Sequence, residues 1–313
     1  MGTTCCRDNV NAPEVTHVEE AQPTHSNLSE SNDDLRHAPS ECDASLSPSS
    51  QPQIDAAIKN ANSHGITESD LLDPSWTIQM FGPYHYHSNG DLYYGQFKSA
   101  LRHGLGALIQ TDGTTYVGQF SSNLISGRGI LAHRDGSYYL GHLKYNQLYG
   151  QGTMTDVNGN KYVGQYLQSQ KHGQGLETYQ DGATYEGQWA QDKQHGSGKW
   201  VWSDGSFYEG DLEAGHIHGK GRYRWADLRE YVGGWKDDGM HGEGVFTWAD
   251  GKRYSGGYVN DKKEGWGEFR WPSGKEYRGW WKDGKQHGEG EVVDAKMGTS
   301  IVGSWVDGKR SVV

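Results

Sequence analysis

Cysteine is scarce in this chain of 313 residues, and its distribution excludes disulfide bonds from most of the sequence. The three cysteines are Cys5, Cys6 and Cys42, a usage typical of a reducing compartment. Long hydrophobic runs are also missing, which excludes a membrane-spanning helix of about 18 apolar residues. The first residues contain no apolar stretch like that of a secretory signal peptide. We therefore expect a cytoplasmic protein.

Basic residues are in short supply as well. The chain has 29 Lys and Arg against 40 Asp and Glu, for a formal net charge of -11. Residues 1–75 hold 13 of the acidic residues and only three of the basic ones, so the remainder is nearly neutral. Proteins that bind nucleic acid present a basic stripe to the phosphates. The sequence therefore predicts no nucleic-acid partner.

The composition changes sharply at residue 75. All 12 Trp and 44 of the 46 Gly lie beyond it. Each Gly in a helix interior costs about 1 kcal/mol, so residues 76–313 cannot form a helical bundle. These residues must instead adopt a fold in which the many glycines are packed against the many large aromatic side chains.

The first part of the chain has the composition of a tether. Residues 9–50 are rich in Ser, Asn, Asp, Glu and Pro and poor in aromatic residues, which predicts disorder. A short helix is expected near residues 51–63, because apolar residues recur there with helical spacing. These residues are Ile54, Ala57, Ile58 and Ala61. Residues 1–75 are therefore read as an acidic, mostly disordered tail.

Beyond the tail, the sequence repeats every 23 residues without insertion or deletion. Tyr recurs at Tyr93, Tyr116, Tyr139, Tyr162, Tyr185, Tyr208, Tyr231, Tyr254 and Tyr277. Gly follows each Tyr after two residues, and a bulky apolar side chain follows after four. A spacing of two places all three on one face of a strand. The first segment of each unit is therefore predicted to be a strand.

A second strand is predicted after a Gly-x-Gly pair that recurs in every unit. Large residues again alternate after this pair, as in Trp200/Trp202 and Phe246/Trp248. Turn signals such as Asp-Gly113 and Asp-Gly136 lie between the paired strands. We expect hairpins with strands of five or six residues, one longer loop and one tight turn. Leu228 replaces the Gly of the sixth unit, which predicts an altered turn there.

Hairpins of this kind are not stable alone, so neighbouring units must pair edge to edge. The predicted fold is all-β, an elongated single-sheet hairpin repeat behind the tail. We divide the array of residues 76–313 into a half unit at 76–92, nine full units at 93–299 and a terminal half unit at 300–313.

The core is predicted to form where aromatic rings lie flat over the bare backbone of the glycines. Each buried ring contributes about 2–3 kcal/mol. The predicted core residues include Tyr93, Gly95, Phe97, Tyr116, Gly118, Phe120, Tyr185, Gly187, Trp189, Tyr231, Gly233, Trp235, Tyr277, Gly279 and Trp281.

The pattern Tyr-x-Gly-x-(Phe/Trp) followed by His-Gly-x-Gly, at 23-residue spacing, resembles the MORN (membrane occupation and recognition nexus) repeat from about Tyr84 to Trp305. The resemblance implies an elongated β-sheet that acts as a scaffold. It also implies self-association, attachment to the cytoskeleton or an organelle, or contact with phospholipid.

No pattern of catalytic or cofactor-binding residues is found, so we expect no enzyme activity and no cofactor. Six of the 15 His precede the Gly-x-Gly pair, in a slot that Ser126 and Glu264 occupy in other units. A slot that accepts Ser is unsuited to a metal ligand. The pairs His85/His87 and His216/His218 offer two ligands each without an evident third. No metal site is predicted.

The N-terminus suggests lipid attachment. The sequence Met1-Gly2-Thr3-Thr4-Cys5-Cys6 resembles an N-myristoylation site at Gly2 followed by palmitoylation sites at Cys5 and Cys6, although Cys6 stands where Ser or Thr is usual. Stable anchoring needs two acyl chains, because one myristoyl group binds only marginally.

These observations favour a non-enzymatic scaffold, tethered by acyl chains at the cytoplasmic face of a membrane, with protein partners on the aromatic face or the sheet edges. One alternative is a phosphoinositide-binding module that uses Lys262, Lys263, Arg278 and Lys282. The other is a cytoskeletal or axonemal assembly protein that forms a homodimer through unpaired edge strands.

Overall fold

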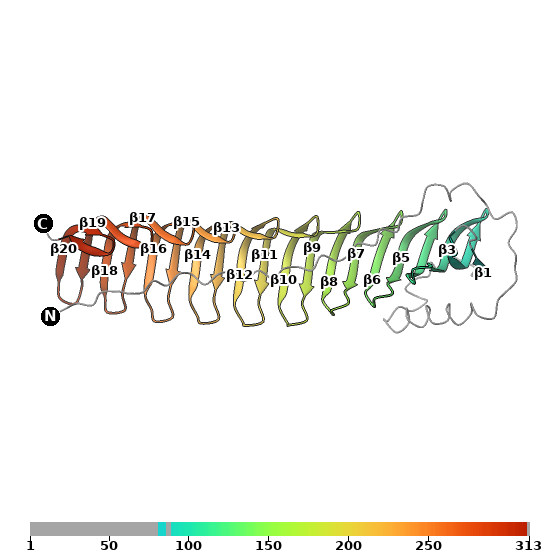
Figure 1. Ribbon diagram of the computed structural model, residues 1–313, viewed down its shortest axis with the longest axis horizontal. Helices are drawn as coiled ribbons and strands as arrows, with labels where there is room; N and C mark the ends of the chain where they lie inside the picture. Colours follow the sequence, from blue (N-terminus) through green and yellow to red (C-terminus); the bar gives the residue numbers. More distant parts are fainter. Residues whose placement is uncertain (1–80, 86–88, 312–313) are drawn as a thin grey trace. The chain divides into compact units, whose positions relative to one another are not determined.

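The computed structural model describes residues 81–85 and 89–311. Over these residues the chain is all-β, and strands pair antiparallel with their neighbours in the chain as an open meander (Figure 1). The all-β repeat predicted from the sequence is confirmed. The predicted tail of residues 1–75 and the predicted helix near 51–63 lie outside the described residues.

The strands divide between two compact units. The N-terminal unit runs to Gln180 and includes Trp189–Asp192, and the C-terminal unit comprises Asp181–Gln188 and the chain from Lys193. Strand β10 (Thr184–Ala190) lies at the division.

The strands of the N-terminal unit are β1 (Phe81–His85), β2 (Leu92–Lys98), β3 (Leu101–Ile109), β4 (Thr115–Ser121), β5 (Leu124–Ala132), β6 (Tyr138–Lys144), β7 (Gln147–Thr155), β8 (Lys161–Leu167) and β9 (Gln170–Thr178). Those of the C-terminal unit are β11 (Lys193–Val201), β12 (Phe207–Glu213), β13 (His216–Arg224), β14 (Glu230–Lys236), β15 (Gly239–Thr247), β16 (Arg253–Val259), β17 (Lys262–Arg270), β18 (Lys275–Lys282), β19 (Lys285–Asp294), β20 (Thr299–Val306) and β21 (Lys309–Ser311).

The tight turn of each hairpin is not where the Asp-Gly pairs predicted it. Strands β2 and β3, of 7 and 9 residues, are joined by Ser99 and Ala100 alone, since Lys98 pairs with Leu101. Both turn residues are left-handed, with φ of 50° and 64°, as in a type I′ turn, whose twist matches that of the strands. The Asp-Gly segments instead form the longer loops that lead to the next hairpin. Our expectation of strands of five or six residues was therefore wrong.

A β-bulge explains the first glycine of each Gly-x-Gly pair. Gly95 pairs with Gly106 and Phe97 pairs with Arg102, so three residues of β3 lie opposite Gln96 alone. Gly104 lies within this bulge at φ +77, a conformation that glycine adopts without steric cost.

The sixth turn keeps the geometry of the others, which overturns the altered turn predicted there. Leu228 has φ 71°, and its N–H donates to the carbonyl of Trp225 at 3.0 Å. Gly113 makes the same bond to Gln110 at 3.0 Å. Leu228 therefore adopts a strained backbone conformation that the surrounding turn imposes.

Consecutive hairpins are joined at their turns by pairs of hydrogen bonds. The N–H of Asn123 donates to the carbonyl of Arg102 at 2.9 Å, and the N–H of Arg102 donates back to Oδ1 of Asn123 at 2.7 Å. Asp261 and Met240 repeat the exchange at 3.0 and 2.7 Å. The second turn residue therefore has two roles, because it adopts the left-handed conformation and its side chain accepts a bond from the previous hairpin.

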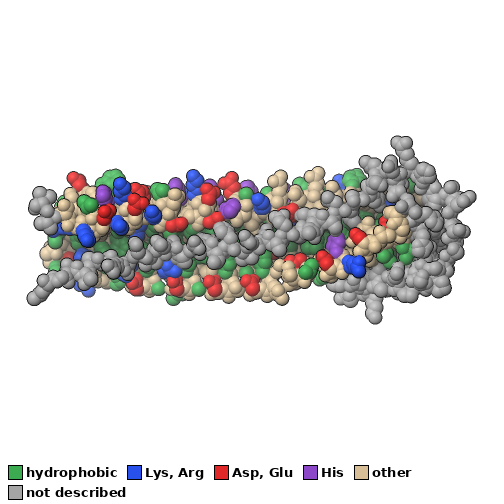
Figure 2. All heavy atoms as spheres, viewed as in Figure 1, with side chains coloured by type: hydrophobic (Ala, Val, Ile, Leu, Met, Phe, Trp, Pro, Cys, Tyr) green, Lys and Arg blue, Asp and Glu red, His purple; other side chains and the backbone are tan. Residues whose placement is uncertain are grey.

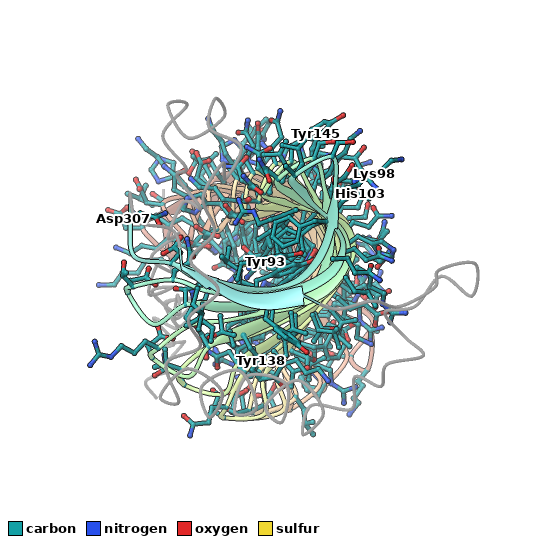
Figure 3. All side chains as sticks on the ribbon, turned by 90° about the vertical axis from the view of Figure 1, so that its right-hand side faces the viewer. Tyr93, Lys98, His103, Tyr138, Tyr145 and Asp307 are labelled. Carbon is teal, nitrogen blue, oxygen red and sulfur yellow. The ribbon has the colours of Figure 1, made fainter. Side chains whose placement is uncertain are left out.

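The nine repeat tyrosines form the core, on what we call the tyrosine face; the opposite side of the strands is the outer face. Each tyrosine is at most 2% exposed. Figure 3 shows Tyr93 within the curve of the strands and Tyr138 outside it. A Cβ on Gly233 would lie 2.5 Å from the Tyr231 hydroxyl oxygen and 2.6 Å from the Cα of Gly244. Only bare backbone leaves room for the ring.

Each tyrosine hydroxyl has a partner that the bulge creates. The hydroxyl of Tyr93 donates to the carbonyl of Gln96, the residue opposite the bulge, at 2.9 Å. The other eight tyrosines donate to the residue three positions later at 2.8–3.1 Å. Burial of the hydroxyl raises the pKa of Tyr277 to about 12. The bond satisfies a carbonyl that the bulge withdraws from regular pairing.

Candidate interaction surfaces

The core leaves the tyrosine rings unavailable to a partner. The bulky residue four positions after each Tyr closes the remaining space, as when Phe120 meets Tyr93 and Tyr116 edge to face with centroids 5.2 Å apart. The corresponding Trp235 meets Tyr231 in the same way at 5.1 Å. Partners that dock on the aromatic side must therefore use other residues than the predicted repeat core.

A second row of rings runs through the C-terminal unit beside the tyrosines. It consists of Trp200, Trp202, Tyr223, Trp225, Phe246, Trp248, Phe269 and Trp271, with successive centroids 4.4–5.7 Å apart. These rings come from β11, β13, β15 and β17 and the residues that follow each strand. Most are buried or half-buried. The second row therefore adds packing to the C-terminal unit and presents little free ring surface.

The four basic residues proposed as lipid contacts are not gathered into one site. Lys263 points to the tyrosine face, where its Nζ lies 5.0–5.3 Å from the centroids of four rings. Lys262 points away from Lys263 and pairs with Asp283 at 3.2 Å. Arg278 pairs with Glu268 and Glu276 at 3.1 and 2.7 Å. Lys282 is exposed at the end of β18.

Two exposed tryptophans stand out on the outer face of the C-terminal unit. Trp266 of β17 and Trp280 of β18 are cross-strand partners, and their side chains are 55% and 54% exposed. We call this pair the tryptophan patch. The repeat pattern predicts a role only for the neighbouring Trp281, although Gly-Trp-Gly at 265–267 and Trp-Trp at 280–281 are visible in the sequence.

The slot of Trp280 is normally filled by a residue that supports the bulge. Gln96 accepts a hydrogen bond from the N–H of Leu105 through Oε1 at 2.8 Å. Four other units repeat this bond through Gln119, Gln165, Gln188 and Asp211. An indole has no acceptor for such a bond. Trp280 therefore lacks the role that the fold gives this slot and exposes a large apolar surface instead.

An ion-pair network borders the tryptophan patch on the same two strands. Glu268 accepts from Arg270 at 3.0 Å and from Arg278 at 3.1 Å, and Glu276 lies 3.2 Å from Arg270. These pairs hold the pKa of Glu268 below its usual value against the effect of its own burial. Figure 2 shows charged side chains of both signs interspersed along the visible face. The patch therefore combines an aromatic centre with a charged rim.

The histidines do not gather into a metal site among the described residues. His216 instead bonds Oδ2 of Asp238 through Nδ1 at 2.7 Å. His218 lies 3.6 Å from Glu213 and 3.7 Å from Asp237. His87 and the acylation candidates Gly2, Cys5 and Cys6 lie outside the described residues. Over the residues that can be placed, no helix is long and apolar enough to cross a bilayer.

The family follows from a comparison with known repeat families. The MORN repeat profile matches nine consecutive segments between residues 93 and 295. These are residues 93–115, 116–138, 139–161, 162–184, 185–207, 208–227, 231–253, 254–276 and 277–295. The chain belongs to the MORN repeat family, as the sequence pattern predicted. Among curated proteins, no match is found.

Solved structures with low similarity include two TCP-type domains, each in complex with a peptide. The TCP10 domain of Danio rerio CPAP, in complex with a STIL peptide, is 12% identical over 68% of this chain and 97% of that one, with a TM-score of 0.37. The TCP domain of Drosophila melanogaster SAS-4, in complex with a proline-rich motif of Ana2, is 9% identical over 48% of this chain and 81% of that one, with a TM-score of 0.30.

Proposed function

We propose that this protein is a non-enzymatic scaffold whose C-terminal unit binds a partner protein at the tryptophan patch, and whose N-terminus is held by acyl chains at the cytoplasmic face of a membrane. MORN repeats are interaction modules, and the exposed indoles of Trp266 and Trp280 carry the proposal. Burying an aromatic side chain contributes about 2–3 kcal/mol. Trp is also among the residues most enriched at energetically important interface positions.

The partner in this proposal is a protein segment that seats an apolar side chain against the two indoles. Its polar groups would meet the charged rim, where Arg270 and Arg278 pair with Glu268 and Glu276 and have further N–H donors to offer. Charges at the rim of an interface direct orientation and association rate more than affinity. The arrangement supports one protein ligand with an apolar anchor and flanking carboxylate or carbonyl acceptors.

The test uses the repeat itself to design a variant that separates binding from folding. Trp280→Gln gives the ninth unit the side chain that other units have in this slot. We expect the free energy of unfolding to stay unchanged or to rise by about 1 kcal/mol, because the amide can accept a bond from the bulge. Partner binding should be lost. A destabilised variant, or one that binds normally, would contradict the proposal.

The partner can be found by photo-crosslinking in the native cells. A benzophenone amino acid is placed at Trp266 of the full chain and, as a control, at Lys220, which occupies the same slot in another unit. Proteins captured at position 266, absent at 220 and lost in Trp280→Gln, are then purified and titrated against the full chain. Identical captures at both positions would reject the patch as the binding site.

The membrane tether is tested on the full chain as well. Mass spectrometry of the N-terminus from native cells should show an acyl group on Gly2 and a second on Cys5 or Cys6. Gly2→Ala should release the protein from the membrane fraction. Binding of the unacylated full chain to vesicles that contain phosphoinositide would favour direct lipid recognition instead.

A further inference from the structure

The outer face of the N-terminal unit carries an apolar cluster that its repeat core does not explain. Ile130 is 2% exposed and packs against Leu105, Val117, Tyr138 and Leu140. The register places Val117 beside Ile130 and Ile130 beside Leu140, so the cluster spans β3–β6. We call these five residues the outer cluster. Its members come from the side of the strands opposite the tyrosines.

The same slots are solvated further along the chain. In the slot of Val117 stand Val163, which is 42% exposed, and Val232, which is 45% exposed. In the slot of Ile130 stands Arg222, which pairs with Glu230 at 2.6 Å. An antiparallel sheet commonly buries one face and leaves the other in water. The four apolar residues around Ile130 are only partly buried, so the outer cluster offers apolar surface to a covering layer, and the described residues form only a sheet and its turns.

We propose that residues 51–80 of this chain form that layer, packing across the outer cluster. The segment leads directly into β1, which pairs with β2 through Tyr84 and Tyr93. Its C-terminal end is therefore two strands from β3, where the cluster begins. Thirty residues reach up to about 100 Å, far more than the roughly 20 Å that four strands span. Its apolar residues include Ile54, Ile58, Leu71, Leu72, Trp76 and Ile78.

A second copy of the chain fits the cluster less well. A stable dimer interface buries about 800 Å² on each partner, which five side chains do not provide. A covalently attached segment needs less area, because its effective concentration reaches about the millimolar range. The inference is independent of acylation and of the tryptophan patch.

Trypsin tests this arrangement on the intact protein, because Lys59 lies within the segment and Arg36 lies before it. We expect cleavage after Lys59 to be at least tenfold slower than after Arg36. Val117→Asp should abolish most of this protection while cleavage after Arg36 stays constant. Val232→Asp is the matched control, with the same residue and slot in the C-terminal unit, and should leave both rates unchanged.

A second variant guards against an unfolded sheet. Ile58→Asp changes only the segment, and it should expose Lys59 to the same degree without shifting the urea midpoint. Equal cleavage after Lys59 and Arg36 in the unmodified protein would overturn the inference. Protection that depends on protein concentration would assign the cluster to a second copy, and protection seen only with an added cellular fraction would assign it to a partner. Either result overturns the inference.

Discussion

The two units share one core and differ in almost everything around it. Both bury their tyrosines completely over paired glycines. Two residues after the Gly-x-Gly pair, the N-terminal unit has Leu108, Leu131 and Met154 before Glu177, whereas the C-terminal unit has rings from Trp200 to Phe269 before Val292. Their outer faces also differ, because the same slot is apolar at Ile130 and charged at Arg222. The Tyr-Gly pairing therefore determines the fold, and the remaining slots are free to differentiate the units.

The largest effect should come from the shared core. Gly233→Ala, in the C-terminal unit, and Gly141→Ala, in the N-terminal unit, each drive a methyl group into a tyrosine and the opposite backbone. We expect each to lower the free energy of unfolding by more than about 3 kcal/mol in urea titrations. Gly136→Ala meets no atom within 4 Å and should cost only about 1 kcal/mol from its left-handed backbone. Equal losses at all three sites would refute the glycine argument.

The second row of rings should make the C-terminal unit more sensitive than the N-terminal one. Phe246→Ala removes a ring that lies 4.4 Å from Trp248 and 5.3 Å from Trp225, so we expect a loss of about 3 kcal/mol. Met154→Ala alters the same slot in the N-terminal unit. Its side chain is half-buried, so the loss should be about 1–2 kcal/mol. Urea midpoints of the two variants, measured side by side, check the difference.

High pH should weaken the core common to both units. Burial raises the pKa of Tyr277 to about 12, above the value near 10 for an unfolded chain. The stability that depends on the neutral hydroxyl is therefore complete below pH 10 and is lost as pH rises toward 12. This one tyrosine accounts for about 2–3 kcal/mol at pH 12. Unfolding measured from pH 8 to 12 should steepen above 10, and less so in Tyr277→Phe.

The turn links should contribute equally in both units. Asp261→Gly removes the side-chain acceptor for Met240, and Asn123→Gly removes the one for Arg102. The new residues keep the left-handed turn, as Gly215 and Gly284 do elsewhere. Each variant should lose about 1 kcal/mol. If urea midpoints show a loss of stability in only one of the two units, the strength of the turn hydrogen bonds depends on the second row of rings.

The smallest predicted effect is a gain in the free energy of unfolding. Leu228→Gly relieves a left-handed leucine and removes a side chain that is 60% exposed. Stability should rise by about 0.5–1 kcal/mol, because the relief of strain exceeds the added freedom of glycine in the unfolded chain. A lower midpoint would show that the leucine makes a contact worth more than its strain.

The regular part of this structure could be predicted from the 23-residue period, because Tyr and Gly recur without exception. The turn positions could not, since Ser99 and Ala100 carry none of the usual residues for a type I′ turn. Aligning the units would have helped, because Asn, Asp or Gly recurs in the second turn position at Asn123, Asn146, Asp192, Gly215, Asp238, Asp261 and Gly284.

The tryptophan patch depends on information that a period cannot supply. Counting residues places Trp266 and Trp280 on strands, but it is the pairing register of β17 with β18 that places them opposite each other. The period does separate the two neighbouring tryptophans, because Trp281 shares the face of Tyr277 and is buried, whereas alternation places Trp280 on the opposite face, where it is exposed.

Because the hydrogen bonds at the turns join consecutive hairpins, each repeat unit contacts only its immediate neighbours through them. Asn123 reaches back to Arg102 and Asp261 reaches back to Met240, always across the same interval of 21 positions. If a gene gains or loses one whole repeat unit, the two units that become neighbours in the protein therefore still match every hydrogen-bond donor with an acceptor. The number of modules can change by unequal recombination without any need to redesign the interior.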